Sequence, residues 1–532
     1  MEKINKVLMV TREYDGVAGA GGVKDVCRQL SEALVRHAGC DVRVVLPCYG
    51  FMDPVALGFK RVQVPCREEA AGMTTVFDVD MNYPDKERRE SVSLWMKKEQ
   101  GVIICLLDAQ RFAEKQAVYT YTPAEEAEKS WQKAGTGHFD FFAMNVLLQK
   151  ATLDLLILLD LRPDIIHCHD GHAAILPAML WEHSGYRHFF CQTGAVVTVH
   201  NAGLGYHQDV EDLDFAQAIT GLPGSVIRSG LFNNAFNPFV VAAGYAQMNT
   251  VSERYARELQ ETNEDSRTGW LGHKLLKKGV DLIGITNGVN AEDFNPVQGK
   301  KRGLAADFNP ETGELDGKRV CKEEMLCLCR AGSQWARVEQ YGHLSENRPH
   351  SPLFTFIGRL TPQKGVDVLL QAVSRLITAD FQLLVLGASD SKLDQDLQEL
   401  TEERHFHDRV CFLKGYDPDL ALKIYAAGDF FLIPSLYEPC GLTDYIAQLF
   451  GNLPIVHHVG GLVKVQDRET GFSYQEHTPD ALAESMRRAL EIYQDAPDRL
   501  AVMRRTAIEH IRTHHSWQHV MEDYLALYQK AL

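Results

Sequence analysis

The sequence predicts an α/β protein with two consecutive domains, each built on a mostly parallel sheet, and three observations lead to this prediction. Short apolar runs, as long as buried strands, alternate with segments of helical periodicity, which is typical of helices covering a parallel sheet. The alternation stops near residue 299 and restarts at residue 353. The length of 532 residues alone allows two to four domains, and the two alternating stretches reduce this number to two large ones.

Composition and charge narrow the classes of function. Apolar residues make up 45% and charged residues 24% of the chain, as in an ordinary globular protein. The formal net charge of −16 argues against a nucleic acid or an anionic membrane as partner. The best apolar candidate for a membrane span, residues 153–159, is cut by Asp160. The start of the chain lacks the apolar segment of a signal peptide and the cysteines are scattered, so we expect a cytoplasmic protein with reduced thiols.

The first domain opens with a buried strand over residues 6–11 and a glycine-rich loop over residues 16–25. A helix follows, because apolar residues recur on one face of a 3.6-residue period, at Val23, Val26, Cys27, Leu30, Ala33 and Leu34. Further strands are expected at residues 41–47, 164–167, 196–200 and 281–286.

The second domain follows a polar stretch, residues 299–350, which shows no sustained strand pattern and which we interpret as a surface excursion or a partner contact. Strands are then expected at residues 353–358, 383–387, 410–413, 430–434 and 453–456, with a helix whose apolar face is Val366, Leu369, Leu370, Val373 and Leu376. Ligands of such sheets bind at the carboxyl ends of the strands, so we expect a site in a cleft between the domains.

Three motifs of the first domain follow predicted strands. The glycine-rich loop either brings backbone N–H groups to an anion or forms a tight turn without a ligand. The segment from His167 to His172 could bind a metal, line a pocket or serve the fold. His167 and His169 alternate on an extended segment and should point the same way, and His172 should begin a helix. His200 and Asn201 could bind sugar hydroxyls, the alternative for the histidine being a satisfied core residue.

Two motifs of the second domain point more specifically to a ligand. Arg359 ends a strand, and Lys364 with Gly365 opens a helix, so the two cations could clamp a diphosphate; the alternative is a solvated pair. Glu438 lies in a strand-to-helix turn, where a carboxylate can bind ligand hydroxyls, oppose positive charge or cap the helix. Gly460-Gly461 repeats the arrangement of a loop before a helix.

Taken in order, these motifs resemble those of bacterial glycogen synthases and plant starch synthases, the retaining glucan synthases of glycosyltransferase family 5. The likeness extends over most of the chain. It is carried by the Gly21-Gly22 loop with Asp25, HCHDGHAA (167–174), TVHN (198–201), TVSERYARE (250–258), TNGVN (286–290), GRLTPQKGVD (358–367), EPCGLT (438–443), GGL (460–462) and SWQHVMEDYLALY (516–528).

The resemblance implies the GT-B fold, in which two Rossmann-like domains with parallel sheets face a deep cleft. The N-terminal, acceptor-side domain is then expected over residues 1–294 and the nucleotide-sugar-binding domain over residues 295–510. Residues 511–532 are expected to form a helix that returns to the first domain.

The resemblance also implies transfer of glucose from ADP-glucose to the non-reducing end of an α-1,4-glucan with retention, without a metal or cofactor. Arg359 and Lys364 would neutralise the departing diphosphate, Glu438 would bind the donor sugar or stabilise charge at the reacting carbon, and His200 would contact the sugar near that carbon. The implied substrate-binding residues are Gly21, Gly22, Asp25, Asn201, Asn287, Cys440, Gly441, Leu442 and Thr443.

The chain departs from the family pattern at several positions. Gly19-Ala20 stand where Lys-Thr is usual, so a loop cation is absent, although Lys24 could partly replace it. Gly171 replaces Trp, Asp444 replaces Gln, and Lys464 stands where Asp is usual. These changes leave two alternatives open: a related transferase with another nucleotide-sugar or a small acceptor, and a weakened paralogue that binds glucan.

Against the sucrose- and mannose-type group of transferases, Ile446 stands where that group has a second Glu, eight residues after Glu438.

Overall fold

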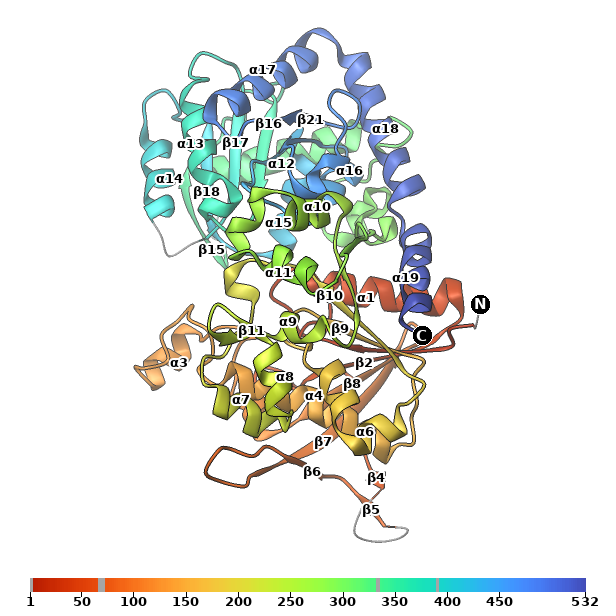
Figure 1. Ribbon diagram of the computed structural model, residues 1–532. Helices are drawn as coiled ribbons and strands as arrows, with labels where there is room; N and C mark the ends of the chain where they lie inside the picture. Colours follow the sequence, from red (N-terminus) through yellow and green to blue (C-terminus); the bar gives the residue numbers. More distant parts are fainter. Residues whose placement is uncertain (1–2, 66–71, 332–334, 389–391) are drawn as a thin grey trace. The chain divides into compact units, whose positions relative to one another are not determined.

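The computed structural model of the protein describes residues 3–65, 72–331, 335–388 and 392–532. The chain forms two compact units. The first unit comprises Met1–Gly288 and Trp517–Leu532, and the second unit comprises Val289–Ser516. The chain thus leaves the first unit after Gly288 and returns to it for its last helix (Figure 1).

The first unit is built on one large sheet. Its strands lie in the order β14 (Ile283–Gly284), β13 (Gln247–Thr250), β10 (Gly194–Val199), β9 (Ile165–His169), β1 (Lys6–Val10), β2 (Asp41–Pro47), β8 (Val102–Asp108), β7 (Arg89–Glu99) and β3 (Lys60–Val62), and β6 (Phe77–Asp80) also pairs with β7. Neighbours from β14 to β8 are parallel, whereas β7 pairs antiparallel with β8, β3 and β6. The parallel part reads 3-2-1-4-5-6-7 in chain order, so the winding reverses at β1, which has β2 on one side and β9 on the other.

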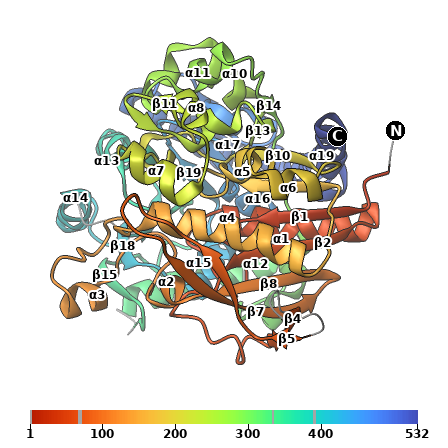
Figure 2. The same cartoon turned by 60° about the horizontal axis from the view of Figure 1, so that its bottom comes forward.

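Helices cover both faces of this sheet. Helix α1 (Val23–Ala33) and helix α4 (Phe141–Leu158) both contact β2 (Figure 2). Among the described residues, α4 is the one helix long and apolar enough to cross a membrane, and 83% of it is buried inside the protein, as in a core helix. The other helices are α2 (Gln110–Ala113), α3 (Pro123–Glu128), α5 (Leu176–Glu182), α6 (Ser184–Phe189), α7 (Leu213–Thr220), α8 (Gly224–Ser229), α9 (Pro238–Ala242), α10 (Glu253–Glu261) and α11 (Leu271–Lys277).

The last helix, α19 (Trp517–Ala531), is part of the first unit and contacts α1, β10 and β13. Trp517 Nε1 donates a hydrogen bond to Gln29 Oε1 at 2.7 Å, and Tyr528 Oη lies 2.9 Å from His167 Nδ1. Both contacts are buried, so α19 is held by polar bonds as well as by its apolar face.

The second unit has a seven-stranded sheet in the order β15 (Val338–Gly342), β18 (Val410–Gly415), β17 (Gln382–Gly387), β16 (Leu353–Ile357), β19 (Phe430–Ile433), β20 (Leu453–His457) and β21 (Phe472–Tyr474). Only β15 is antiparallel to its neighbour. From β18 to β21 the chain order is 3-2-1-4-5-6, which is the dinucleotide-binding topology, and its switch point lies between β16 and β19.

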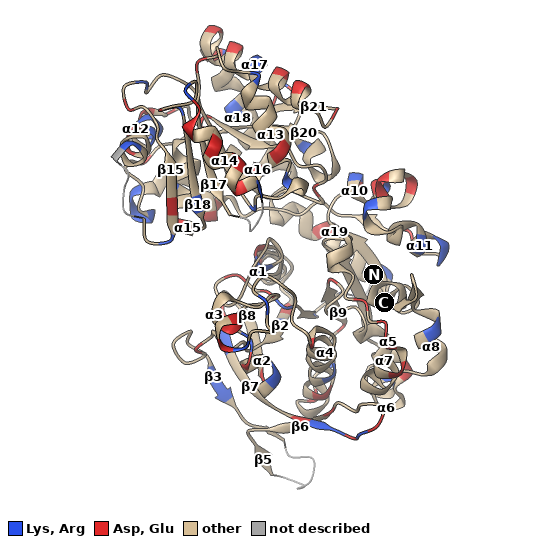
Figure 3. Ribbon diagram, turned by 90° about the vertical axis from the view of Figure 1, so that its left-hand side faces the viewer, with Lys and Arg blue, Asp and Glu red and all other residues tan. Residues whose placement is uncertain are grey.

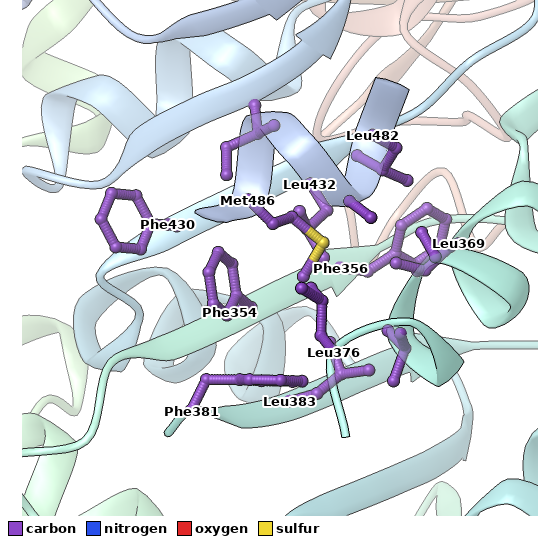
Figure 4. Close-up of a cluster of buried hydrophobic side chains, with 14 of the residues drawn as sticks. Phe354, Phe356, Leu369, Leu376, Phe381, Leu383, Phe430, Leu432, Leu482 and Met486 are labelled. Atoms are coloured by element: carbon purple, nitrogen blue, oxygen red, sulfur yellow. The ribbon is translucent and has the colours of Figure 1, made fainter. Parts of the chain in front are cut away.

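Successive side chains along β16 point to opposite faces of the sheet, so the second unit has hydrophobic clusters on both faces. Phe354 and Phe356 of β16 pack with Leu369 of α13 (Val366–Ser374) and Met486 of α17 (Pro479–Asp495), as Figure 4 shows. Leu353, which points the other way, packs with the buried residues of α12 (Asp316–Ala331) and α15 (Pro418–Ala427). The unit is completed by α14 (Lys392–Glu402), α16 (Thr443–Leu449) and α18 (Pro497–His514).

The structure corrects the interpretation of residues 299–350. This stretch contains helix α12 and the edge strand β15, and α12 lies in the core, where Met325 and Leu326 are fully buried. Its lysines are buried as well: Lys318 Nζ donates to carbonyl oxygens, among them Phe450 O at 2.9 Å, and Lys322 Nζ lies 2.7 Å from Asp429 Oδ2. The stretch is therefore part of the fold of the second unit, with two buried lysines that have partners, while most of its other charged side chains are exposed.

Candidate active site

The residues expected to act in the second unit gather where two neighbouring strands end. Arg359 lies two residues beyond β16 and is exposed. Lys364 ends the 3₁₀-helix η6 (Pro362–Lys364) in the same loop. Glu438 follows β19, which pairs with β16. These residues therefore lie at the carboxyl ends of the strands on either side of the switch point, where ligands of such sheets bind.

Lys364 and Glu438 are in direct contact. Lys364 Nζ lies 2.6 Å from Glu438 Oε2, and the same oxygen accepts a hydrogen bond from Ser435 Oγ at 2.9 Å. The side chains of Lys364 and Glu438 are 25% and 12% exposed, so the pair is shielded from bulk water but still accessible. Sequence reasoning did not single out Ser435, although its place directly after a buried strand is the signal that could have done so.

The backbone around this pair is tightly constrained. Gly365 has a φ of 68°, and a Cβ there would lie 1.9 Å from the carbonyl oxygen of Pro434, so only glycine fits. His477 donates from Nε2 to Pro434 O at 2.8 Å, and His457 donates from Nδ1 to Ser435 O at 2.8 Å. The segment after β19 is thereby fixed against the loop after β16.

The four expected sugar-binding residues after Glu438 lie together in the turn that leads into α16. Cys440 and Gly441 are buried, and Leu442 and Thr443 are half-buried. Thr443 is the first residue of α16.

This turn packs backbone to backbone on the Gly460-Gly461 turn. Gly461 N–H donates to Glu438 O at 2.9 Å. A Cβ on Gly460 would lie 2.0 Å from Glu438 O, and one on Gly461 would lie 2.1 Å from Cys440 O. The paired glycines of the sequence motif are therefore required by the close approach of the two turns.

In the first unit, the glycine-rich loop binds a carboxylate of the protein itself. Glu13 Oε2 accepts the N–H groups of Ala20 at 2.6 Å and Gly21 at 2.8 Å, and Tyr119 donates its hydroxyl to the other oxygen of Glu13. Gly22 is the N-terminal cap of α1. The anion that the loop pattern predicts is thus Glu13 in this structure, a residue that sequence reasoning did not identify.

Lys24 takes the space beside Gly19. A Cβ on Gly19 would lie 2.3 Å from Lys24 Cδ, so the lysine stem covers this glycine. Lys24 Nζ lies 3.1 Å from Asp15 Oδ1 and 3.0 Å from Asp25 Oδ1. Burial raises the pKa of the Asp25 carboxyl, and the charge of Lys24 opposes this shift. The side chains of Lys24 and Asp25 are 31% and 26% exposed, so the cluster is half-open to solvent.

His200 follows β10 and is held through its backbone. Asp170 Oδ1 accepts the N–H of His200 at 2.7 Å and that of Asn201 at 3.4 Å. The ring of His200 meets the ring of His169, with His200 Nε2 and His169 Nδ1 2.9 Å apart. Burial lowers the pKa of His200 to about 3, so its ring is neutral near pH 7. Asp170, which lies in the HCHD segment, thus fixes the backbone at His200 and Asn201, a contact that sequence reasoning did not predict.

His167, in the same segment, binds other groups of the protein through both ring nitrogens. His167 Nε2 lies 2.6 Å from Thr198 Oγ1, and its Nδ1 contacts Tyr528 of α19. The rings of His167 and His169 lie 4.2 Å apart, so the two point the same way, as predicted. The expectation that His172 begins a helix is wrong, because α5 begins only at Leu176. In the described part of the chain, no three His, Cys, Asp or Glu side chains converge as metal ligands do.

The last expected residue of the first unit is Asn287. It is 3% exposed and lies directly before Gly288, where the chain passes into the second unit. The structure thus groups the expected residues into two sets: Lys364 and Glu438 meet in the second unit, and His200 and Asn201 share Asp170 in the first.

Comparison with protein families gives two matches. The model of the starch synthase catalytic domain family matches residues 6–276, and the model of glycosyl transferases group 1 matches residues 344–508. Among curated proteins, the glycogen synthase of Geotalea daltonii is 32% identical over 506 residues, which cover 92% of each chain. The glycogen synthase of Aeromonas salmonicida is 30% identical over 540 residues, which cover 99% of this chain and 98% of that protein.

Solved structures confirm the predicted GT-B fold. The catalytic domain of starch synthase IV from Arabidopsis thaliana, bound to ADP and acarbose, superposes with a TM-score of 0.79 at 24% identity and covers 100% of this chain and 99% of that one. Sucrose-phosphate synthase from Thermosynechococcus elongatus gives a TM-score of 0.58 at 18% identity, with 99% and 98% covered. The fold, the family models and the curated relatives agree, and the chain is a glycosyltransferase that belongs to the family of glycogen synthases and starch synthases.

Proposed function

We propose that the protein transfers glucose from ADP-glucose to the non-reducing end of an α-1,4-glucan with retention of configuration. The observation that carries the proposal is the contact of Lys364 with Glu438 at the switch point of a dinucleotide-type sheet. Two comparisons support the proposal: the curated proteins that match this chain are glycogen synthases, and the Arabidopsis structure is bound to ADP and acarbose.

The cations Lys364 and Arg359 are assigned to the diphosphate. As the bond between the glucose and the diphosphate of the donor breaks, negative charge develops on the leaving ADP, and the ammonium of Lys364 and the guanidinium of Arg359 stabilise that charge. Lys364 already has an anionic partner, Glu438, so a bound diphosphate shares the lysine with this carboxylate. Glu438 in turn accepts hydrogen bonds from donor hydroxyls or opposes positive charge at the reacting carbon.

Residues of the first unit are assigned to the sugar and the acceptor. His200 is neutral, so it acts as a hydrogen-bonding ring rather than as a cation, and Asp170 holds its backbone in place. Asn201, Asp25 and Asn287, with the loop at Gly21 and Gly22, complete the proposed acceptor side.

Cationic side chains supply the charge that a metal ion would otherwise provide, so we propose a reaction without metal or cofactor. All the cysteines that the structure describes are free thiols, which favours a reducing compartment, and we propose the cytoplasm. The net charge of −16 is spread over both units, with acidic and basic residues on many helices (Figure 3), and favours neither nucleic acid nor membrane as partner.

The direct test incubates the protein with ADP-, UDP- or GDP-glucose and either glycogen or a malto-oligosaccharide, with and without EDTA. Release of the nucleoside diphosphate and growth of the glucan chain are followed together. We expect elongation with ADP-glucose that is insensitive to EDTA. Release from another nucleotide-sugar only would support a related transferase, and binding of glucan without any release would support a non-catalytic glucan-binding protein.

A further inference from the structure

The ammonium of Lys464 occupies a cage of backbone carbonyls. Lys464 ends the 3₁₀-helix η7 (Gly460–Lys464), and its side chain is 7% exposed. Nζ lies 2.5 Å from Cys440 O, 2.8 Å from Gly441 O and 3.1 Å from Gly461 O. It also lies 4.4 Å from the centre of the Tyr445 ring. Every contact except that to Gly461 is to the turn after Glu438 or to the start of α16.

Asp444 neutralises this ammonium. Asp444 Oδ2 lies 3.2 Å from Lys464 Nζ, and the Asp444 side chain is fully buried. A lysine ammonium has three N–H donors, and three carbonyls accept them, so the carboxylate contributes mainly its charge. Burial raises the pKa of Asp444 to about 6, and the charge of Lys464 opposes the rise. The two departures from the family pattern at positions 444 and 464 are thus one feature, a buried ion pair.

The carbonyl contacts dictate where the neighbouring N–H groups point. The described chain has no cis peptide bonds, and in a trans peptide unit the N–H points opposite to the C=O. Lys464 binds the carbonyls of Cys440 and Gly441, so the N–H groups of Gly441 and Leu442, which belong to the same peptide units, face away from it. Gly441 has a φ of 74°, which lets the chain present both carbonyls to the one cation.

The same ammonium joins the two interlocked turns. Its bond to Gly461 O adds to the bond from Gly461 N–H to Glu438 O, so Gly461 is tied to the turn after β19 directly through its N–H and, through Lys464, by its carbonyl oxygen. Without the cation, three carbonyls in this tightly packed region would lose their donor, and a buried carboxylate would lose its counter-charge.

We propose that Lys464, with Asp444 as its counter-ion, is a positioning residue that acts as a tethered cation: it fixes the turn 438–442 and orients the N–H groups of Gly441 and Leu442 toward the donor. The inference rests on the proposed function, in which this turn holds the sugar of the nucleotide-sugar. It adds to that function a residue that touches no substrate and acts only through the backbone it holds.

The kinetic test compares Lys464→Met, which keeps the stem and removes the charge, with Lys423→Met. Lys423 lies in the same unit, on α15, and pairs with Glu324 at 3.3 Å, so its replacement removes an ion pair without touching either turn. We expect Lys464→Met to lose about tenfold to hundredfold in kcat/KM for the donor, because small misplacements of binding groups cost rates of this order, while KM for the glucan stays unchanged. Lys423→Met should behave as the parent protein.

Chemical rescue separates a tethered cation from a simple contribution to folding. In Lys464→Ala, ammonium or methylammonium ions in the buffer should restore part of the lost kcat/KM, because the carbonyl cage is left empty, whereas tetramethylammonium is too large to enter it. Rescue that depends on cation size supports the inference, and a loss that no small cation restores overturns the tethered-cation part of it.

Amide hydrogen exchange of the unliganded protein gives a readout that does not need activity. We expect exchange in residues 438–443 to rise at least about tenfold in Lys464→Met and to stay unchanged in Lys423→Met. Unchanged exchange together with unchanged kinetics overturns the inference. If the parent protein transfers no glucose from any donor but exchange rises, the proposed function fails while the positioning of the turn is supported.

If Lys464→Met does not fold, Asp444→Asn provides the same measurements with a milder change. It removes the counter-charge but keeps the side-chain volume, so we expect a smaller rise in exchange and a smaller loss of kcat/KM in the same direction. Kinetics and exchange identical to those of the parent protein would overturn the role of Asp444.

Discussion

At the scale of residues, the chemistry of the candidate site depends on ion pairs that the sequence shows only in part. The sequence predicted Arg359 and Lys364 as one pair of cations and Glu438 as a separate carboxylate, because each motif follows an apolar strand. It could not show that Lys364 and Glu438 touch, since 74 positions separate them along the chain and only the pairing of β16 with β19 brings them together. Ser435, Glu13 and Asp170 were missed for the same reason, because each acts on a group that is fixed only by the fold.

The first prediction concerns Lys364 and Glu438. Lys364→Met removes a cation assigned to the leaving diphosphate, and Glu438→Gln keeps the acceptor for Ser435 but removes the negative charge. We expect each variant to lose about 10² to 10³ in kcat, as for removal of one charge-stabilising group, with a thermal midpoint close to that of the parent. Steady-state kinetics with ADP-glucose measures this. Glu402→Gln, an exposed change on α14, is the control, and near-normal rates for Lys364→Met would contradict its assigned role.

The second prediction concerns Gly19 and Lys24, which share one space. The Lys24 stem lies where a side chain at position 19 would begin, so the loop has room for one lysine and not for two. We expect Lys24→Ala, which removes both the charge and the stem, to lower kcat/KM for the donor about tenfold, and Gly19→Lys to lower it as well because the new side chain displaces Lys24. The double variant Gly19→Lys with Lys24→Ala leaves room for one lysine and should recover most of the loss. Additive losses in the double variant would show that the two lysines do not substitute for each other.

At the scale of elements, apolar runs predicted most but not all of the parallel strands, since β8 was not predicted despite its apolar sequence and the strand expected at 281–286 is only Ile283–Gly284. The strands at 6–11, 41–47 and 453–456 were found within one or two residues of their predicted bounds, because strands buried on both faces are continuously apolar. Strand β13 was missed because its residues, Gln-Met-Asn-Thr, are largely polar. Its Asn249 accepts a hydrogen bond from Thr198 Oγ1 at 2.7 Å, and Thr198 also contacts His167. In this strand, a series of buried side-chain hydrogen bonds stands where other strands have apolar residues.

The third prediction is that His167, which takes part in these buried hydrogen bonds, makes the stability of the first unit sensitive to acid. Burial lowers the pKa of His167 to about 3, whereas an unfolded histidine titrates near 6.5, so the unfolded state binds the proton in between. Because the folded pKa is depressed, the free energy of unfolding falls as the pH is lowered from 6.5 toward 3, by up to about 1.4 kcal/mol per pH unit for this one group. Burial raises the pKa of Asp170 to about 7, so the folded state binds this proton more readily than the unfolded state. Asp170 therefore adds to the free energy of unfolding as the pH falls below 7, which is the opposite of the effect of His167.

Urea unfolding of the parent and of His167→Gln at several values between pH 4 and pH 6.5 measures the effect. We expect the variant to lose less stability on acidification, by the equivalent of about one proton, whatever its stability at neutral pH. The exposed His405→Gln is the matched control and should keep the slope of the parent protein. Equal slopes for the parent and His167→Gln would show that this histidine does not resist protonation.

At the scale of the whole molecule, the two cations that we propose for the diphosphate belong to the same unit. Acidic residues exceed basic ones by 16, yet Arg359 and Lys364, the cations assigned to the diphosphate, lie together within residues 289–516. The sequence predicted two α/β domains from the repeated alternation. It could not show from periodicity that the last sixteen residues join the first unit, because tertiary contacts establish this, among them the buried contacts of Trp517 and Tyr528 with α1 and β9.

The fourth prediction follows from this assignment. ADP alone, without sugar or glucan, should bind to the second unit, because Arg359, Lys364 and the turn 438–442 all belong to it. At about a hundredfold its Kd, a ligand that binds only the folded state adds roughly 2.7 kcal/mol to the free energy of unfolding. We therefore expect ADP to slow amide exchange in the strands and loops around β16 and β19 and to raise the thermal midpoint of the second unit. In Lys364→Met both effects should shrink, whereas adenosine, which lacks the diphosphate, should protect this region weakly in either protein. Protection by ADP that is confined to residues 6–276, or that is equal in the parent and in Lys364→Met, would contradict the placement of the diphosphate.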